Sequence, residues 1–271
     1  MTFGILLTAM IVQGVALSLI MSAAWVVQQR TGNSGWIDAV WTFGLGAVGV
    51  ASALVPVNPG DWPTQHQILV AALITIWALR LGSHILRRSA HKADDPRYGE
   101  LIRGWGVDAG RQMFILLQKQ ALVSIPLSLS LFSAAQNPEP GIGSQEALAV
   151  CIFVTAVLGE AIADRQLRTF ASKPPNKARV CDVGLWRWSR HPNYFFEWLH
   201  WLTYPAIGIS LTGAYPIGWV SLAAPLCMYW LLTRVSGVPP LELHMVRRHG
   251  AAYRAYQART NAFFPGPPKN A

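Results

Sequence analysis

Long apolar stretches, interrupted by short polar segments, dominate the chain. A helix of about 20 apolar residues crosses a hydrocarbon core of about 30 Å. Sliding hydropathy predicts seven such spans, at 2–28, 36–56, 66–88, 112–134, 145–168, 192–212 and 214–234. The pattern therefore predicts an all-α, polytopic integral membrane bundle of seven transmembrane helices. No Lys or Arg precedes the first stretch, which is also too long for a signal peptide, so we expect it to be retained.

Basic residues fall on alternate connections between these spans. The loops 57–65 and 135–144 contain no Lys or Arg, whereas 87–111, 173–190 and the tail 247–269 contain most of them. Cytoplasmic loops collect Lys and Arg. The distribution predicts an N-terminus outside and a C-terminus in the cytoplasm, in the cell inner membrane if the protein is bacterial.

Composition agrees with a bilayer environment. The chain is 52% hydrophobic and only 13% charged, whereas soluble domains have about a quarter charged residues. The chain has a net charge of +9, and its basic residues lie beside the predicted spans. This position favours anionic lipid headgroups and an anionic cytosolic ligand as partners over nucleic acid. The three cysteines have no metal-ligand spacing, so we expect no metal and no disulfide framework.

Ionisable residues inside a predicted span are functional candidates, and the fifth span has the densest set. In LGEAIADRQLRTF, residues Glu160, Asp164 and Arg168 follow one another at intervals of four, which places them on one helical face. Asp164 and Arg168 have the spacing of an intrahelical ion pair. Alternatively, the two carboxylates bind a ribose or an amide, and Arg165, Arg168 and Arg179 bind phosphates.

The segment SRHPNYFFEW begins the sixth predicted span. Pro192 suits the first turn of a helix, and Asn193 and Glu197 then lie four apart on one face. An interfacial collar with aromatic anchors explains Arg187 and the neighbouring tryptophans. Asn193 and Glu197 would lie inside the bilayer, so we expect them to meet a ligand.

Further polar residues lie in the second, third and seventh spans. Asp38 has no cation within one helical turn, so it is either paired across helices or held neutral, as a proton donor. The flanking Trp36 and Trp41 are expected to line a substrate cavity, whereas most other tryptophans fit interfacial belts. Arg80 and His84 are four apart in the third span, and Arg234 ends the seventh.

With these residues in view, the chain resembles the steroid 5α-reductase family in its wide sense, which includes bacterial members. The similarity covers ADRQLRTF, RHPNY-x-x-E and the basic tail ending YRAYQARTNAFFP, and it is weaker in the N-terminal half. RHPNY-like motifs also occur in sterol C14 reductases and isoprenylcysteine carboxyl methyltransferases. The resemblance implies one membrane-embedded domain that holds NADPH in a cavity open to the cytosol, with 1–140 on the substrate side and 141–271 mainly on the cofactor side.

The resemblance also implies cofactor-binding residues. Asp164, Arg168, Arg179, Asn193, Glu197 and Arg234 match the family's residue types. Glu160 replaces an asparagine, and Glu242 stands where a tyrosine is expected. Arg80 and His84 match an Arg and a Tyr of the third span. The remaining predicted cofactor contacts are Arg97, Tyr98, Lys173, Arg190, His191, Tyr194, Tyr253 and Tyr256. The two tyrosines of the tail also fit an amphipathic surface helix.

The family polarises a substrate ketone with a Glu and a Tyr. Asp38 is the best counterpart of the Glu, but the third span has no tyrosine, and Trp77 occupies the matching place. An indole N–H donates a hydrogen bond without transferring a proton, so Asp38 acts alone or another group helps.

The expected activity is NADPH-dependent reduction of the C4=C5 bond of a 3-oxo-Δ4 steroid or similar lipophilic enone, by a monomer. The alternatives are an S-adenosylmethionine-dependent methyltransferase and a non-enzymatic sterol-binding membrane protein.

Overall fold

The computed structural model describes residues 2–57, 60, 62–90, 96–176 and 179–269. Within these residues the chain is helical and contains no strand, only an isolated bridge between Ser189 and Asn261. Six helical stretches of the described chain are long and apolar enough to cross a membrane: Phe3–Thr31, Gly35–Ala53, Gln65–Arg87, Tyr98–Ala135, Ser144–Ala171 and Pro216–His249. The all-helical prediction is thus confirmed for the described residues, and the six apolar helices are consistent with an integral membrane protein.

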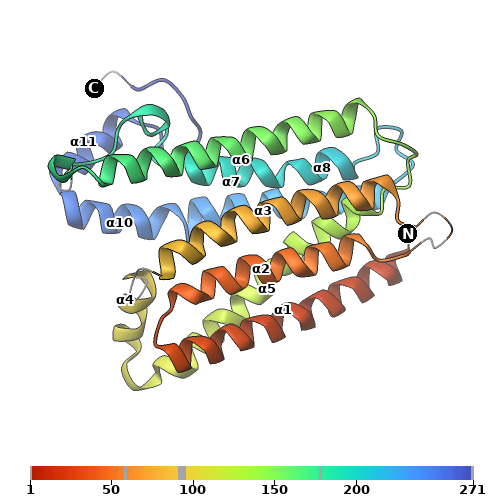
Figure 1. The fold of residues 1–271 in the computed structure, drawn as a ribbon, viewed down its shortest axis with the longest axis horizontal. Helices are drawn as coiled ribbons and strands as arrows, with labels where there is room; N and C mark the ends of the chain where they lie inside the picture. The colour runs from red at the N-terminus through yellow and green to blue at the C-terminus, as the bar shows by residue number, and fades with distance from the viewer. Residues whose placement is uncertain (1, 58–59, 61, 91–95, 177–178, 270–271) are drawn as a thin grey trace. The chain divides into compact units, whose positions relative to one another are not determined.

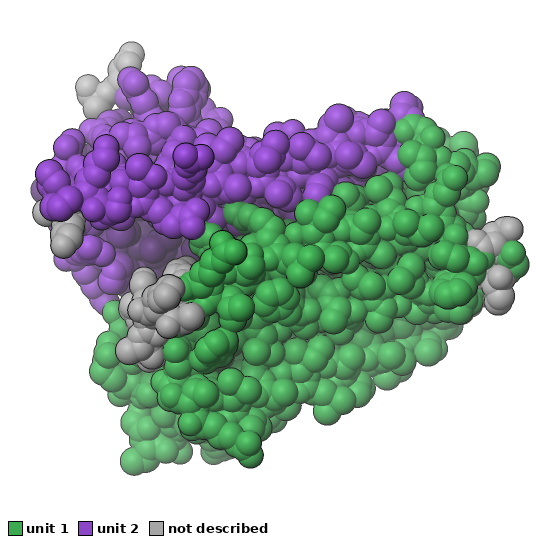
Figure 2. All heavy atoms as spheres, viewed as in Figure 1, with its two compact units in different colours: residues 1–143, 207–224 green, residues 144–206, 225–271 purple. Residues whose placement is uncertain are grey.

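The chain divides into two compact units (Figure 2). The first comprises 1–143 and 207–224, and the second comprises 144–206 and 225–271.

The first unit is built on four long helices (Figure 1): α1 (Phe3–Thr31), α2 (Gly35–Ala53), α3 (Gln65–Ala90) and α5 (Ala109–Ala135). The short α4 (Pro96–Trp105) and the 3₁₀ turn η2 (Gly106–Asp108) connect α3 to α5, and η5 (Pro216–Leu222) packs on α5. α2 packs on both α1 and α3. Glycine permits this close approach, because a Cβ at Gly46 would lie 2.4 Å from the Cβ of Ala78.

The second unit begins with α6 (Ser144–Ala171), which packs on α7 (Pro192–Trp201). Two 3₁₀ turns, η3 (Pro174–Asn176) and η4 (Gly184–Arg187), lie between them in the chain. The elements that follow are α8 (Thr203–Gly208), α9 (Ala223–Trp230), the π-helix η6 (Leu231–Val235), α10 (Val238–His249) and α11 (Ala251–Arg259). α8 and α9 each extend across a boundary between the units.

The predicted span 192–212 is not a single helix. α7 ends at Trp201, and α8 runs only from Thr203 to Gly208. Pro205 explains the break, because its ring conflicts with the carbonyl of the residue four positions earlier, Trp201, and it cannot donate to that carbonyl. A seventh span and the orientation of the termini therefore stay predictions.

Candidate functional site

The two carboxylates predicted on α6 are both buried. Glu160 is 6% exposed and Asp164 is 9% exposed, and they share one helical face. Arg168 is exposed and forms no ion pair with any described residue. The intrahelical pair between Asp164 and Arg168 is therefore not found among the described residues, and ligand binding at this face stays a prediction.

α7 presents a second polar face. Pro192 occupies the first helical position, as predicted. Asn193 is half-buried and Glu197 is buried, and Glu197 accepts a hydrogen bond from Trp201 Nε1 at 3.0 Å. α6 and α7 approach closely beside these residues, because a Cβ at Gly159 would lie 2.4 Å from the ring of Phe196. The sequence places Glu160 and Glu197 next to this contact.

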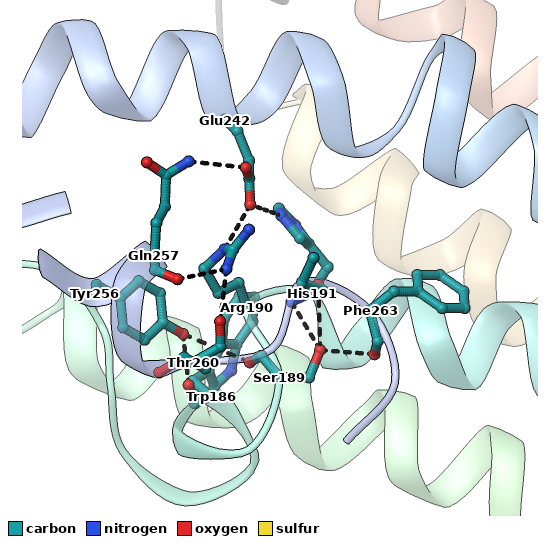
Figure 3. A network of polar contacts seen from close by, with 10 residues as sticks. Trp186, Ser189, Arg190, His191, Glu242, Tyr256, Gln257, Thr260 and Phe263 are labelled. Atoms are coloured by element: carbon teal, nitrogen blue, oxygen red, sulfur yellow. Dashed lines mark hydrogen bonds and ion pairs between the residues drawn. The ribbon is translucent and has the colours of Figure 1, made fainter. Parts of the chain in front are cut away.

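Arg190 and His191, at the start of the same motif, meet Glu242 of α10 (Figure 3). Arg190 Nε lies 2.6 Å from Glu242 Oε1, and His191 Nε2 lies 3.1 Å from the same oxygen. Gln257 of α11 donates to Glu242 Oε2 at 2.8 Å. One carboxylate thus joins the segment before α7 to both C-terminal helices. We call Arg190, His191, Glu242, Gln257 and Thr260 the C-terminal network.

Backbone contacts complete this attachment. Arg190 Nη1 donates to the carbonyl oxygens of Gln257 at 3.1 Å and Thr260 at 2.5 Å. The Tyr256 hydroxyl donates to the Trp186 carbonyl, and Ser189 Oγ donates to the Phe263 carbonyl at 2.8 Å.

These contacts change how four predicted cofactor ligands are interpreted. Arg190, His191, Glu242 and Tyr256 use these polar groups inside the protein and so fix the C-terminal segment, while their contacts with a cofactor stay predictions. Tyr253 is buried beside them, 5.8 Å from Tyr256 between ring centroids.

His191 is the most buried side chain of the network, at 1% exposed. Burial lowers the pKa of His191 below its usual 6.5, outweighing the opposing effect of Glu242. We infer a neutral ring that donates from Nε2 to Glu242. Nδ1 is buried and has no hydrogen-bond partner among the described residues, and the ring stacks on Tyr194 at 5.6 Å between centroids.

The predicted phosphate-binding cations fall into separate groups. Lys173 and Arg179 line a groove of about 550 Å³ together with Arg165. Arg165 points roughly 100° around α6 from Asp164, so the two side chains do not share a face. Arg234 is exposed on the π-helix η6, a local geometry that often marks functional sites.

In the first unit, Asp38 has a partner that the sequence did not reveal. The Tyr98 hydroxyl of α4 donates to Asp38 Oδ1 at 3.0 Å, and Gln120 Nε2 of α5 donates to the Tyr98 oxygen at 3.1 Å. Tyr98 is 6% exposed and Asp38 is half-buried. The structure thus joins a carboxyl, a phenol and an amide from three helices. The predicted contact of Tyr98 with a cofactor stays a prediction.

The predicted aromatic residues of this unit lie in different surroundings. Trp77 is fully buried and packs edge-on against Trp41 at 6.4 Å between ring centroids. Trp41 Nε1 donates to Ser124 Oγ at 2.8 Å, and Trp36 is half-buried. Arg80 and His84 are half-buried on α3. The side chain of Arg97 lies outside the described residues.

Comparison with known proteins places the chain in a family. The family model described as "Protein of unknown function (DUF1295)" matches residues 24–260. The chain belongs to the DUF1295 family. This family includes steroid 5α-reductase-like membrane proteins. The uncharacterized protein C594.04c of Schizosaccharomyces pombe is 24% identical over an alignment of 280 positions, which covers 94% of this chain and 79% of that protein. No solved structure matches the chain.

Proposed function

We propose that this DUF1295 protein is an NADPH-dependent reductase of the C=C bond of a lipophilic enone, such as a 3-oxo-Δ4 steroid. The observation that carries the proposal is the set of buried carboxylates on two helices that pack on each other, Glu160 and Asp164 on α6 and Glu197 on α7. Buried ionisable groups within membrane helices are costly and usually functional. We also propose that the chain crosses the membrane seven times, binds the cofactor on the cytosolic side and acts as a monomer.

The residues present fit a reduced dinucleotide. Glu160, Asp164 and Glu197 offer acceptors for ribose hydroxyls and a carboxamide, and Asn193 offers both donors and acceptors. The exposed guanidinium groups of Arg168 and Arg234 suit phosphates. Arg80, His84, Tyr194 and Tyr253 stay in the proposed cofactor set. When bound, NADPH supplies the hydride for the β-carbon of the enone.

Asp38 and Tyr98 supply the proton chemistry in this proposal. A phenol is a competent proton donor, whereas the indole of Trp77 is not. Gln120 fixes the phenol oxygen by donating to it, and Asp38 orients the hydroxyl by accepting its hydrogen bond. The Tyr98 hydroxyl proton is then directed to the substrate ketone, where enolate charge develops. The enol formed returns this proton to Tyr98 as solvent protonates the α-carbon. Trp36 and Trp41 line the substrate side.

The test is NADPH consumption by the purified full-length protein with testosterone or progesterone. Asn193→Ala is expected to weaken NADPH affinity, whereas Asp38→Ala and Tyr98→Phe are expected to lower turnover by about 10²–10⁴-fold with NADPH still bound. The exposed Glu100→Gln is the control. Full rates in all these variants would show the roles to be wrong. Saturable binding of S-adenosylmethionine in place of NADPH would favour a methyltransferase.

A further inference from the structure

A groove of about 550 Å³ lies beside the C-terminal end of α6. α6 forms one wall, and the segment that leads to η4 contributes to the other. Three cations line it, Arg165, Lys173 and Arg179, together with apolar side chains that include Ile162 and Phe170. We call it the basic groove.

The cations of the basic groove are not neutralised within the described protein. Arg165, Lys173 and Arg179 are exposed and form no hydrogen bond or ion pair through their side chains with any described residue. Asp182 also lines the groove, but its carboxylate is paired with Arg259 at 2.6 Å. The groove therefore has an uncompensated positive charge.

The walls of the groove are fixed by other side chains. Gln166 accepts a hydrogen bond from the Leu185 backbone at 2.9 Å, and Asn176 donates to the Phe170 carbonyl at 3.1 Å. The amides therefore hold the segment after α6 against the helix, while the cations stay available. This division is typical of a preformed binding site.

An apolar stripe leads along α6 into the groove. Val154, Leu158 and Ile162 follow at intervals of four and are 45%, 56% and 49% exposed, so they lie along one side of the helix. Continuing along this side reaches Arg165 and Gln166. Exposed apolar side chains on a membrane-spanning helix contact acyl chains. At one end of α6, the apolar stripe that contacts acyl chains is therefore followed directly by the cations of the basic groove.

We propose that the basic groove binds the phosphate of an anionic phospholipid whose acyl chain lies along Val154, Leu158 and Ile162. Basic pockets at the ends of membrane helices suit anionic headgroups. A phospholipid explains both the apolar stripe and the cations of the groove, whereas a soluble phosphate compound explains only the cations. Glu160 and Asp164 lie on the other side of α6, so this site is distinct from the proposed cofactor face.

The experiment measures lipid binding to the delipidated full-length protein in detergent by native mass spectrometry. Phosphatidylglycerol and phosphatidylcholine with identical acyl chains are compared on the wild type and on the triple variant Arg165→Gln, Lys173→Gln and Arg179→Gln. The control triple variant, Arg247→Gln, Arg248→Gln and Arg254→Gln, removes the same charge from exposed positions of the same unit. Thermal unfolding of both variants checks that they are folded.

We expect the wild type to prefer phosphatidylglycerol and the groove variant to lose this preference. Each cation near an anionic surface contributes about fivefold in affinity, so the loss for three is on the order of a hundredfold. The control variant should stay within about twofold of the wild type. Equal losses in both variants would overturn the proposal, because they would indicate general charge attraction.

Two further arms identify the source of the phosphate. Glycerol 3-phosphate, which lacks acyl chains, should bind much more weakly than the lipid. NADPH should leave lipid binding unchanged and should bind the groove variant as it binds the wild type. If NADPH displaces the lipid and the groove variant loses NADPH affinity, the groove belongs to the dinucleotide and the lipid proposal is wrong. An inactive wild type that keeps the lipid preference would refute only the proposed reductase activity.

Discussion

Removing the carboxylate of Glu242 should release the C-terminal helices. In Glu242→Ala, the donors of Arg190, His191 and Gln257 lose their shared acceptor. Breaking a buried ion pair costs about 3–5 kcal/mol. The Arg190 and Glu242 side chains are 10% and 16% exposed, so water can reach the unpaired guanidinium in part. We therefore expect a loss of about 2–4 kcal/mol in the free energy that closes this segment.

Limited proteolysis measures this loss without requiring reversible unfolding. Trypsin cleaves after the arginines of α10 and α11, and cleavage at low protease concentration follows the population of the open segment. A change of about 3 kcal/mol corresponds to a more than hundredfold faster initial cleavage, since 1.4 kcal/mol is about tenfold. Glu100→Gln, an exposed carboxylate of the first unit, should change the rate less than twofold. A Glu242→Ala rate within twofold of the wild type would refute the reasoning.

Two further predictions follow from burial and packing. Because burial lowers the pKa of His191 below 6.5, the folded state takes up fewer protons than the unfolded state there. The contribution of neutral His191 to the free energy of unfolding is therefore fully present above pH 6.5 and is lost as the pH falls below it. His191→Asn should reduce this pH dependence in thermal melts between about pH 7.5 and pH 5. Gly159→Ala should lower stability by about 1–3 kcal/mol, since the new Cβ would lie 2.4 Å from the Phe196 ring. Gly104→Ala, which has nothing within 4 Å, should be neutral or slightly stabilising in the same melts.

Helical periodicity predicted which residues share a face, but it could not identify their partners. Glu160 and Asp164 share one face of α6, as their spacing predicted, and both are buried. Asp38 was expected either to be paired across helices or to be neutral, and its observed partner, Tyr98, is 60 positions away in the chain. Tyr98 lies on α4, a short helix beyond the predicted third span. No periodic pattern in α2 contains that information, because the contact depends on the path of the chain between α3 and α5.

The break between α7 and α8 could have been predicted locally. Pro205 stands in the middle of the stretch 192–212, and hydropathy does not detect its effect because proline scarcely alters a window average. Arg190 shows a different limit. Its type and its place before Pro192 suit a phosphate ligand as well as a structural donor, and the sequence does not show that Glu242 and two backbone carbonyls lie within its reach.

The C-terminal network fixes the start of α7, the helix that carries part of the proposed cofactor face. α7 begins at Pro192, directly after the two residues that Glu242 holds. The first turn of a helix sets the direction in which every later side chain points, so the orientation of Asn193 depends on where Arg190 and His191 are fixed. Glu242 stands where the family resemblance led us to expect a tyrosine that touches the cofactor. Here the Glu242 carboxylate contacts Arg190 and His191, the two residues before α7, so this position fixes the start of the helix that carries Asn193 and Glu197.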